Sequence, residues 1–163
     1  MKRSIVVFSF LMGVSILLSS LSVDVISAQD EEAFKEQIEN FGKKKTNKLP
    51  VNYTLSEAKR NGDITPGNMT EQQKKRIFEF KENVKSKNPD FIRFSSFGKG
   101  GIAPIIKEFQ FNGEIIYYRY DSTRSVHSAQ KVVEDYCKKI EHLDKPFKST
   151  FLTSCFYHES IEF

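Results

Sequence analysis

The residues best placed to do chemistry follow a tyrosine-rich segment in the second half of the chain. Asp121, Arg124 and His127 lie close together in the sequence, between a predicted strand and a predicted helix. A carboxylate beside an imidazole is the minimal pair for general-base catalysis, because the carboxylate orients the ring. Asp and Ser at the end of a strand are also ordinary turn and N-cap residues, and no serine of the chain sits in a Gly-x-Ser-x-Gly motif. We therefore favour capping over catalysis at Asp121 and do not expect an enzyme.

The strand before these residues offers a surface that suits a ligand. Tyr117 and Arg119 share one of its faces, whereas Ile116, Tyr118 and Tyr120 share the other, because side chains alternate along a strand. Tyr and Arg are enriched at binding hot spots. The alternative, that the fold covers both faces, stays open. The candidate binding surface comprises Tyr117, Arg119, Asp121, Arg124 and His127.

Residues 1–28 have the layout of an export signal. The basic pair Lys2-Arg3 precedes a mostly apolar run over residues 5–21, and a small residue, Ala28, marks the expected cleavage site. The alternative is an uncleaved membrane anchor, because the run approaches the roughly 20 residues that span a bilayer. In both cases we expect residues 29–163 to be extracellular or associated with the cell envelope.

Cys137 and Cys155 are the only cysteines of the chain. In an exported protein such a pair predicts a disulfide, to which the chain-entropy model assigns roughly 3 kcal/mol for a loop of this size. Two buried thiols or a metal pair are the alternatives. Two cysteines alone make a poor zinc site, and neither His142 nor His158 has a histidine four residues away. We therefore expect no metal and no cofactor.

The first part of the exported chain is predicted to be a helix followed by a linker. Apolar residues recur at helical spacing over residues 29–41. Residues 43–50 are rich in lysine and have little to bury, so we expect an exposed linker, whose basic cluster could attract anionic polymers or lipid head groups. The predicted organisation is a signal peptide at residues 1–28, a helix and linker at 29–54, and an α+β domain at 55–163.

Two capping boxes mark helix starts in this domain. Thr54 and Glu57 open a brief helical turn, and Thr70 and Gln73 open a longer helix that ends near residues 87–89. The longer helix should pack against a sheet through one apolar stripe, at whose margin Phe78 lies. The stripe is formed by Ile77, Phe80 and Val84.

The centre of the domain is predicted to be a meander of three antiparallel strands. Asn112-Gly113 separates residues 105–111 from residues 114–120, and both of these flanking runs are apolar and aromatic. We expect a two-residue type I′ turn here, because Asn and Gly both accept the positive φ that this turn demands. The glycine-rich residues 98–101 should join the strand at 91–97 to the same sheet.

The remainder is predicted to add one helix and one strand. A helix is expected over residues 126–141, because its apolar residues recur at helical spacing, and the aromatic content of residues 151–157 favours a final strand. The fold class is therefore α+β, with an antiparallel sheet of three to four strands packed against two main helices. The helical stripe comprises Val132, Val133, Tyr136, Cys137 and Ile140.

A series of short motifs resembles an uncharacterised family of exported Gram-positive proteins, catalogued as domain of unknown function 4362. The resemblance covers roughly residues 55–157 and depends on the order of the motifs. It implies a compact α+β envelope domain with paired cysteines, and it assigns no activity. The chain departs from the lipoproteins of this family because no cysteine follows the apolar run. The motifs are residues 58–64, 90–93, 104–105, 111–113 and 120–124, with Cys137 and Cys155.

Three functions are compatible with this sequence. The leading hypothesis is a secreted or envelope-associated, non-catalytic binding module, a monomer whose partner is an envelope protein, a peptide or an anionic wall polymer. The net charge of +4 is too small to indicate nucleic acid, and contact with a membrane is expected only through an uncleaved signal segment. The alternatives are a small extracellular hydrolase that uses Asp121 and His127, and a structural envelope protein.

Overall fold

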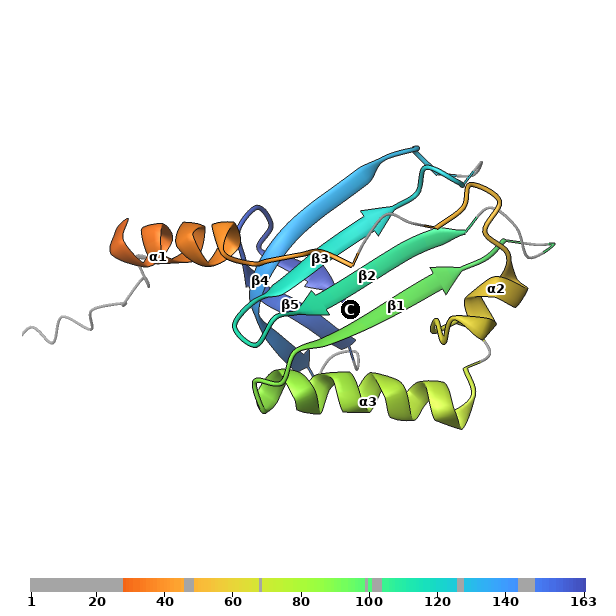
Figure 1. The fold of residues 1–163 in the computed structure, drawn as a ribbon, viewed down its shortest axis with the longest axis horizontal. Helices are drawn as coiled ribbons and strands as arrows, with labels where there is room; N and C mark the ends of the chain where they lie inside the picture. Colours follow the sequence, from red (N-terminus) through yellow and green to blue (C-terminus); the bar gives the residue numbers. More distant parts are fainter. Residues whose placement is uncertain are drawn as a thin grey trace, which may run out of the picture.

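The computed structural model describes residues 28–45, 49–67, 69–98, 100, 104–125, 128–143 and 149–163. These residues form an α+β fold of three helices and one six-stranded antiparallel sheet, with the strands in meander order (Figure 1). None of the helices in the described ranges is long and apolar enough to cross a membrane. The elements are α1 (Ala28–Glu39), α2 (Leu55–Arg60), α3 (Glu71–Lys85), β1 (Asp90–Ser96), β2 (Ile105–Phe111), β3 (Ile116–Asp121), β4 (Val132–Leu143), β5 (Ser149–Cys155) and β6 (Ser160–Glu162).

The predicted meander is confirmed, but its central turn differs from the expected one. Phe111 pairs with Ile116, so four residues connect β2 to β3. Of Asn112 and Gly113, only Gly113 has a positive φ, of 104°. The Asn112 side chain instead accepts hydrogen bonds from the amides of Glu114 and Ile115, both at 2.9 Å. The prediction of a two-residue type I′ turn is therefore wrong, because the asparagine side chain closes a longer loop.

The helix predicted over residues 126–141 is wrong, because Val132–Leu143 form strand β4. Its apolar residues have helical spacing, yet they divide between the two faces of the sheet. Tyr136 lies on the face that carries Tyr117, whereas Cys137 lies on the face that carries Leu152. The added strand satisfies the second edge of β3, and such tertiary pairing overrides a weak local pattern. With β4 and β6 the sheet has six strands, more than the three to four predicted.

One face of the sheet packs against α3. Phe80 is fully buried in this core, with Ile77 and Val84 beside it, whereas Phe78 is 61% exposed, as the sequence predicts. The sheet twists and curves around this core. The ring of Phe163, which follows β6, stacks on Phe80 and contacts Phe94 of β1. Helix α3 therefore closes the open side of the curved sheet, alongside β1 (Figure 1).

The other face is covered by α1 and by the chain that follows it. Phe34 and Phe41 pack there against aromatic residues of β3, β4 and the β5–β6 turn. Residues 42–45 then cross the sheet, where Gln110 accepts a hydrogen bond from the amide of Lys45 (2.6 Å) and donates one to the carbonyl of Lys43 (3.1 Å). The lysine side chains of this segment are exposed, as expected of a linker, but its backbone is bound to the sheet.

Candidate functional site

A row of alternating charges crosses the sheet on the face that α1 covers. Arg93 of β1 lies opposite Glu108 of β2, which lies opposite Arg119 of β3, which lies opposite Glu134 of β4. Arg93 Nε is 2.8 Å from Glu108 Oε1, and Arg119 is 3.8 Å from Glu108 Oε2 and 3.7 Å from Glu134 Oε1. We call these four residues the charge row. Its charges are neutralised by one another.

The inner part of the charge row is shielded from water. The side chains of Arg93, Glu108 and Arg119 are 13%, 1% and 12% exposed, respectively. Burial raises the pKa of Glu108 above its ordinary value, although the guanidiniums of Arg93 and Arg119 oppose this effect. The three side chains come from β1, β2 and β3. A change of register would separate the Glu108 carboxylate from an arginine and leave a desolvated charge without its partner, so these ion pairs stabilise the register of the three strands.

Asp63 extends the charge row at the β1 edge. Its carboxylate accepts hydrogen bonds from Ser95 Oγ (2.6 Å) and from the Tyr53 hydroxyl (2.8 Å), and it lies 3.4 Å from Arg93. Burial, with a contribution from Asp63, raises the pKa of Tyr53 to about 12. Every one of these partners fixes the chain between α2 and β1, so the Asp63 carboxylate has a structural role.

Asp121 is held in the same way at the end of β3. Its Oδ1 accepts from the amide of Thr123 (3.0 Å) and the hydroxyl of Thr123 (2.6 Å), and its Oδ2 lies 2.9 Å from both Arg119 and Arg124. Burial alone would raise the pKa of Asp121, but the hydrogen bonds from Thr123, Arg124 and Arg119 outweigh it and lower the pKa to about 2. Arg124 also donates to the carbonyls of Leu49 and Pro50, which ties this turn to the segment before α2.

The structure places four of the five residues of the candidate binding surface on this one face. Tyr117 is fully buried and donates its hydroxyl to Glu134 at 2.7 Å, and Arg119 belongs to the charge row. Asp121 joins Arg119 to Arg124, as described above. His127 lies outside the described residues. Tyr117 and Arg119 therefore contribute to the interior more than to an open surface.

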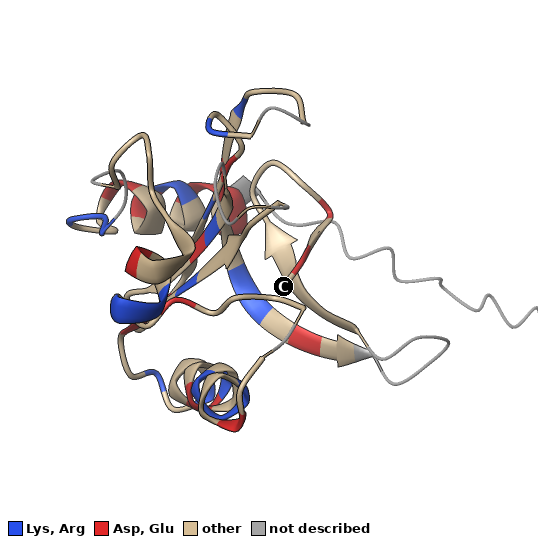
Figure 2. Cartoon of the chain, turned by 90° about the vertical axis from the view of Figure 1, so that its right-hand side faces the viewer, with Lys and Arg blue, Asp and Glu red and all other residues tan. Residues whose placement is uncertain are grey.

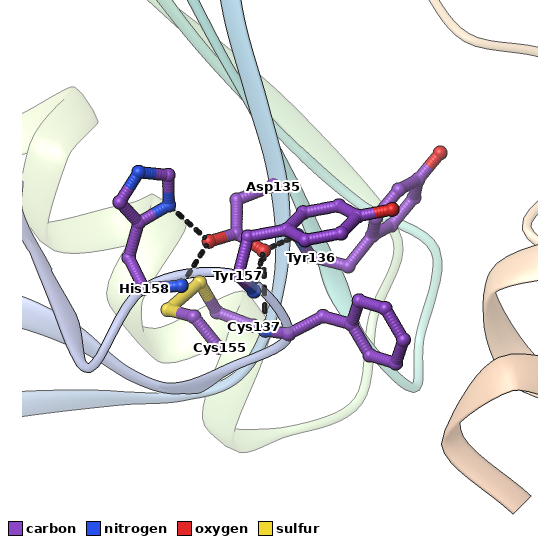
Figure 3. Close-up of a disulfide and its surroundings, with 7 residues drawn as sticks. Asp135, Tyr136, Cys137, Cys155, Tyr157 and His158 are labelled. Atoms are coloured by element: carbon purple, nitrogen blue, oxygen red, sulfur yellow. Dashed lines mark hydrogen bonds and ion pairs between the residues drawn. A yellow bond between two sulfur atoms is a disulfide. The ribbon is translucent and has the colours of Figure 1, made fainter. Parts of the chain in front are cut away.

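The predicted disulfide is confirmed between Cys137 and Cys155 (Figure 3). It joins facing residues of β4 and β5, whose Cα atoms are 3.9 Å apart. The pairing is the one expected, although it links two strands rather than a helix and a strand.

A fully buried carboxylate beside the disulfide was missed by the sequence reasoning. Asp135 Oδ1 accepts from the amides of Tyr136 (2.7 Å), Phe156 (3.1 Å) and Tyr157 (3.0 Å). Its Oδ2 accepts from the amide of His158 (3.0 Å) and lies 2.7 Å from the imidazole Nδ1 of that residue (Figure 3). Asp135 therefore anchors the β5–β6 turn to β4. Residues 135 and 158 are too far apart in the sequence for any spacing rule to predict their contact. The only sequence signal for this site was an acidic residue inside a segment rich in β-branched and aromatic residues.

Asp135, Cys137 and Cys155 bring their ligand atoms within 4.8 Å of one another. Metal binding requires thiolates, and here the two sulfur atoms are bonded to each other. The Asp135 carboxylate moreover already accepts hydrogen bonds from the backbone amides of the β5–β6 turn. This cluster therefore suits a structural staple better than a metal site.

An open groove with a volume of about 740 Å³ lies between α2, α3 and β1. Its walls are held by local bonds: Arg76 of α3 pairs with Asp90 and donates to the carbonyl of Phe91, and Gln73 donates to the carbonyl of Asp63. Ile64 adds a short parallel bridge to Phe94. The groove is built from three separate elements, so no local motif could predict it.

Searches of protein-family models, of curated proteins and of solved structures found no match to this chain. The resemblance to the exported Gram-positive family therefore stays a prediction.

Proposed function

We propose that this chain is an exported, non-catalytic binding module that holds an anionic polymer of the cell envelope along the groove between α2, α3 and β1. The observation that carries the proposal is the charge of the groove, which is lined by four cationic and only two acidic side chains. A pre-formed, polar and cationic groove suits an extended anionic ligand. The cationic residues are Lys59, Lys75, Arg76 and Arg93, and the acidic ones are Asp63 and Glu79.

The two lysines are the groups available to a ligand. Lys59 is exposed and takes part in none of the ion pairs between described residues. Lys75 lies 3.5 Å from Glu79 in an exposed pair, which contributes little and can be exchanged for a ligand. Arg76 and Arg93 are paired with Asp90 and Glu108, so they keep the groove in shape and leave the lysines as its ligand-binding charges.

The carboxylates described above support binding rather than catalysis. Asp63 and Asp121 each accept hydrogen bonds from several partners, and the pKa of Asp121 lies at about 2. A general base needs a pKa near the working pH, so such a carboxylate is a poor one. The disulfide is consistent with an oxidising compartment and hence with export.

Co-sedimentation of the purified protein with cell-envelope fractions tests this proposal. Wild type should bind at low salt and be released at high salt, because salt screens exposed charge contacts. The double variant Lys59→Gln/Lys75→Gln should bind at least about tenfold more weakly, which corresponds to roughly 0.7 kcal/mol for each lysine. Lys131→Gln/Lys139→Gln is the matched control, since both lysines are exposed and neither lines the groove.

Two outcomes would contradict the proposal. Equal loss of binding in the groove variant and the control variant would show that net charge, not the groove, is recognised. Binding that resists salt and disappears when the envelope fraction is treated with protease would indicate a protein partner instead of a polymer.

A further inference from the structure

A second hollow, of about 320 Å³, lies between α3 and the ends of β4 and β5 that face it. Its lining comes from α3 and from the two strands: Phe78, Lys81, Glu82, Val84 and Lys85 of the helix, with Ile140, His142 and Thr150 of the strands. Figure 2 views α3 nearly end-on, at the bottom of the molecule. No residue of this hollow lines the groove described above, so the two sites are independent.

Lys81 is unlike the other lysines of α3. Lys74, Lys75 and Lys85 each pair with a glutamate three or four residues away on the same helix. The positions three and four residues from Lys81 are Ile77, Phe78, Val84 and Lys85, so its own helix offers it no carboxylate.

The Lys81 ammonium points toward the strands, where it donates to Thr150 Oγ1 at 2.9 Å and lies 5.6 Å from the ring centroid of Phe163. None of the ion pairs between described residues includes it. Burial, followed by repulsion from Lys85, lowers the pKa of Lys81. The fold thus holds a half-buried cation whose charge is left uncompensated, which costs free energy that a bound anion would recover.

The remaining walls of the hollow are mostly apolar, and the charge of Glu82 in its lining is paired with Lys85 at 2.6 Å. Phe78 is 61% exposed at its rim, and Val84 and Ile140 are partly buried on either side. An exposed phenylalanine next to two aliphatic side chains favours an apolar ligand body. The volume lies at the lower end of the range for small-molecule sites.

We propose that this hollow binds a small carboxylic acid with an apolar body. A carboxylate oxygen of the ligand accepts from the Lys81 ammonium, while the body lies against Phe78, Val84 and Ile140. The combination of one desolvated cation and an apolar wall selects a monocarboxylate over a neutral compound and over a hydrophilic anion.

Isothermal titration calorimetry with 3-phenylpropionate and octanoate tests this site. Wild type should bind both acids, and it should bind 3-phenylpropanol and acetate at least about tenfold more weakly, because the alcohol lacks the charge and acetate lacks the body. Lys81→Met should weaken the acids by at least about tenfold, and Phe78→Ala by several-fold. Lys74→Met, on the same helix outside the hollow, should bind as wild type does.

The melting temperature of Lys81→Met gives a second test, which needs no ligand. Because Lys81 is an uncompensated cation, Lys81→Met should keep or raise the melting temperature of the free protein, which shows that a loss of binding is not a loss of folding. Unchanged binding in Lys81→Met, equal binding of the alcohol, or no binding of either acid would each overturn the proposal. A peptide that ends in a free phenylalanine carboxylate shares the same chemistry, and tighter binding of that peptide than of the free acids would overturn the small-acid assignment.

Discussion

Asp121 closes the turn after β3, the kind of role that the sequence favours over catalysis, and it also pairs with two arginines. Arg119 comes from its own strand and Arg124 from the turn that follows, and both guanidiniums reach the same carboxylate oxygen at 2.9 Å. Arg124 also holds the carbonyls of Leu49 and Pro50. One carboxylate therefore connects a strand, a turn and the segment before α2, and its charge stabilises all three.

Replacing Asp121 by Asn tests this role through its pH dependence. The pKa of Asp121 in the folded protein is about 2, below the ordinary value of 3.8, so its charge stabilises the fold above pH 3.8. This stabilisation is lost as the pH falls from 3.8 toward 2. At pH 7, Asp121→Asn should lower the free energy of unfolding by about 1 to 2 kcal/mol, after allowance for solvent screening.

Urea denaturation of both proteins at pH 7 and at pH 2 to 3 measures this difference. The gap between wild type and variant should shrink at the lower pH. Glu114→Gln, in an exposed loop position, should change the free energy of unfolding by less than about 0.5 kcal/mol at either pH. If the difference in the free energy of unfolding between wild type and Asp121→Asn does not change with pH, Asp121 stabilises the fold through packing and hydrogen bonds that do not depend on its charge.

The ion-pair partners of Arg119 depend on strand register, which the sequence did not predict correctly. The expected two-residue turn at Asn112-Gly113 would place Glu108 opposite Tyr117. The four-residue loop places Glu108 opposite Arg119 instead. A shift by two residues keeps every side chain on its face, so the faces of β3 were predicted correctly while the charge row was not.

At the scale of elements, α3 shows what the sequence predicts well. Its start follows from the Thr70 and Gln73 capping box, which is present with both hydrogen bonds, and its buried face follows from the apolar stripe. These signals are local, so they do not depend on the rest of the fold. Strand β4 shows the opposite case. Its apolar residues have the spacing of a helix, but in the structure Tyr136 and Cys137 pack into different cores on opposite faces of the sheet.

Phe80 and Phe78 provide a matched pair for testing the face of α3. Phe80 is fully buried against Phe163, whereas Phe78, two residues earlier, is 61% exposed. Phe80→Ala should lower the free energy of unfolding by about 3 to 5 kcal/mol, because it leaves a cavity in the core. Phe78→Ala should cost less than about 1 kcal/mol. Comparable costs in urea denaturation would mean that α3 in solution presents a different face to the sheet, with Phe78 and Phe80 similarly buried.

At the scale of the whole molecule, the segment after α1 joins the N-terminal helix to the sheet. Gln110 of β2 holds it by two hydrogen bonds, and the Lys44 ammonium lies 4.3 Å from the ring centroid of Tyr117. The composition of residues 43–50 predicts a solvated linker, because lysines have little to bury. The two hydrogen bonds involve backbone groups of this segment, and composition carries no information about them.

Gln110→Ala removes both hydrogen bonds to this segment and so tests whether α1 and the sheet form one unit. The side chain is only 9% exposed, so the variant leaves the amide of Lys45 and the carbonyl of Lys43 without their partner and should cost about 1 to 2 kcal/mol. Native-state hydrogen exchange should show a protected Lys45 amide in wild type and faster exchange in the variant. Gln130→Ala, at an exposed position, is the control and should leave this exchange unchanged. If the Lys45 amide exchanges equally fast in wild type and Gln110→Ala, the segment is not bound to the sheet in solution, and the charge row would then be open to solvent on that side.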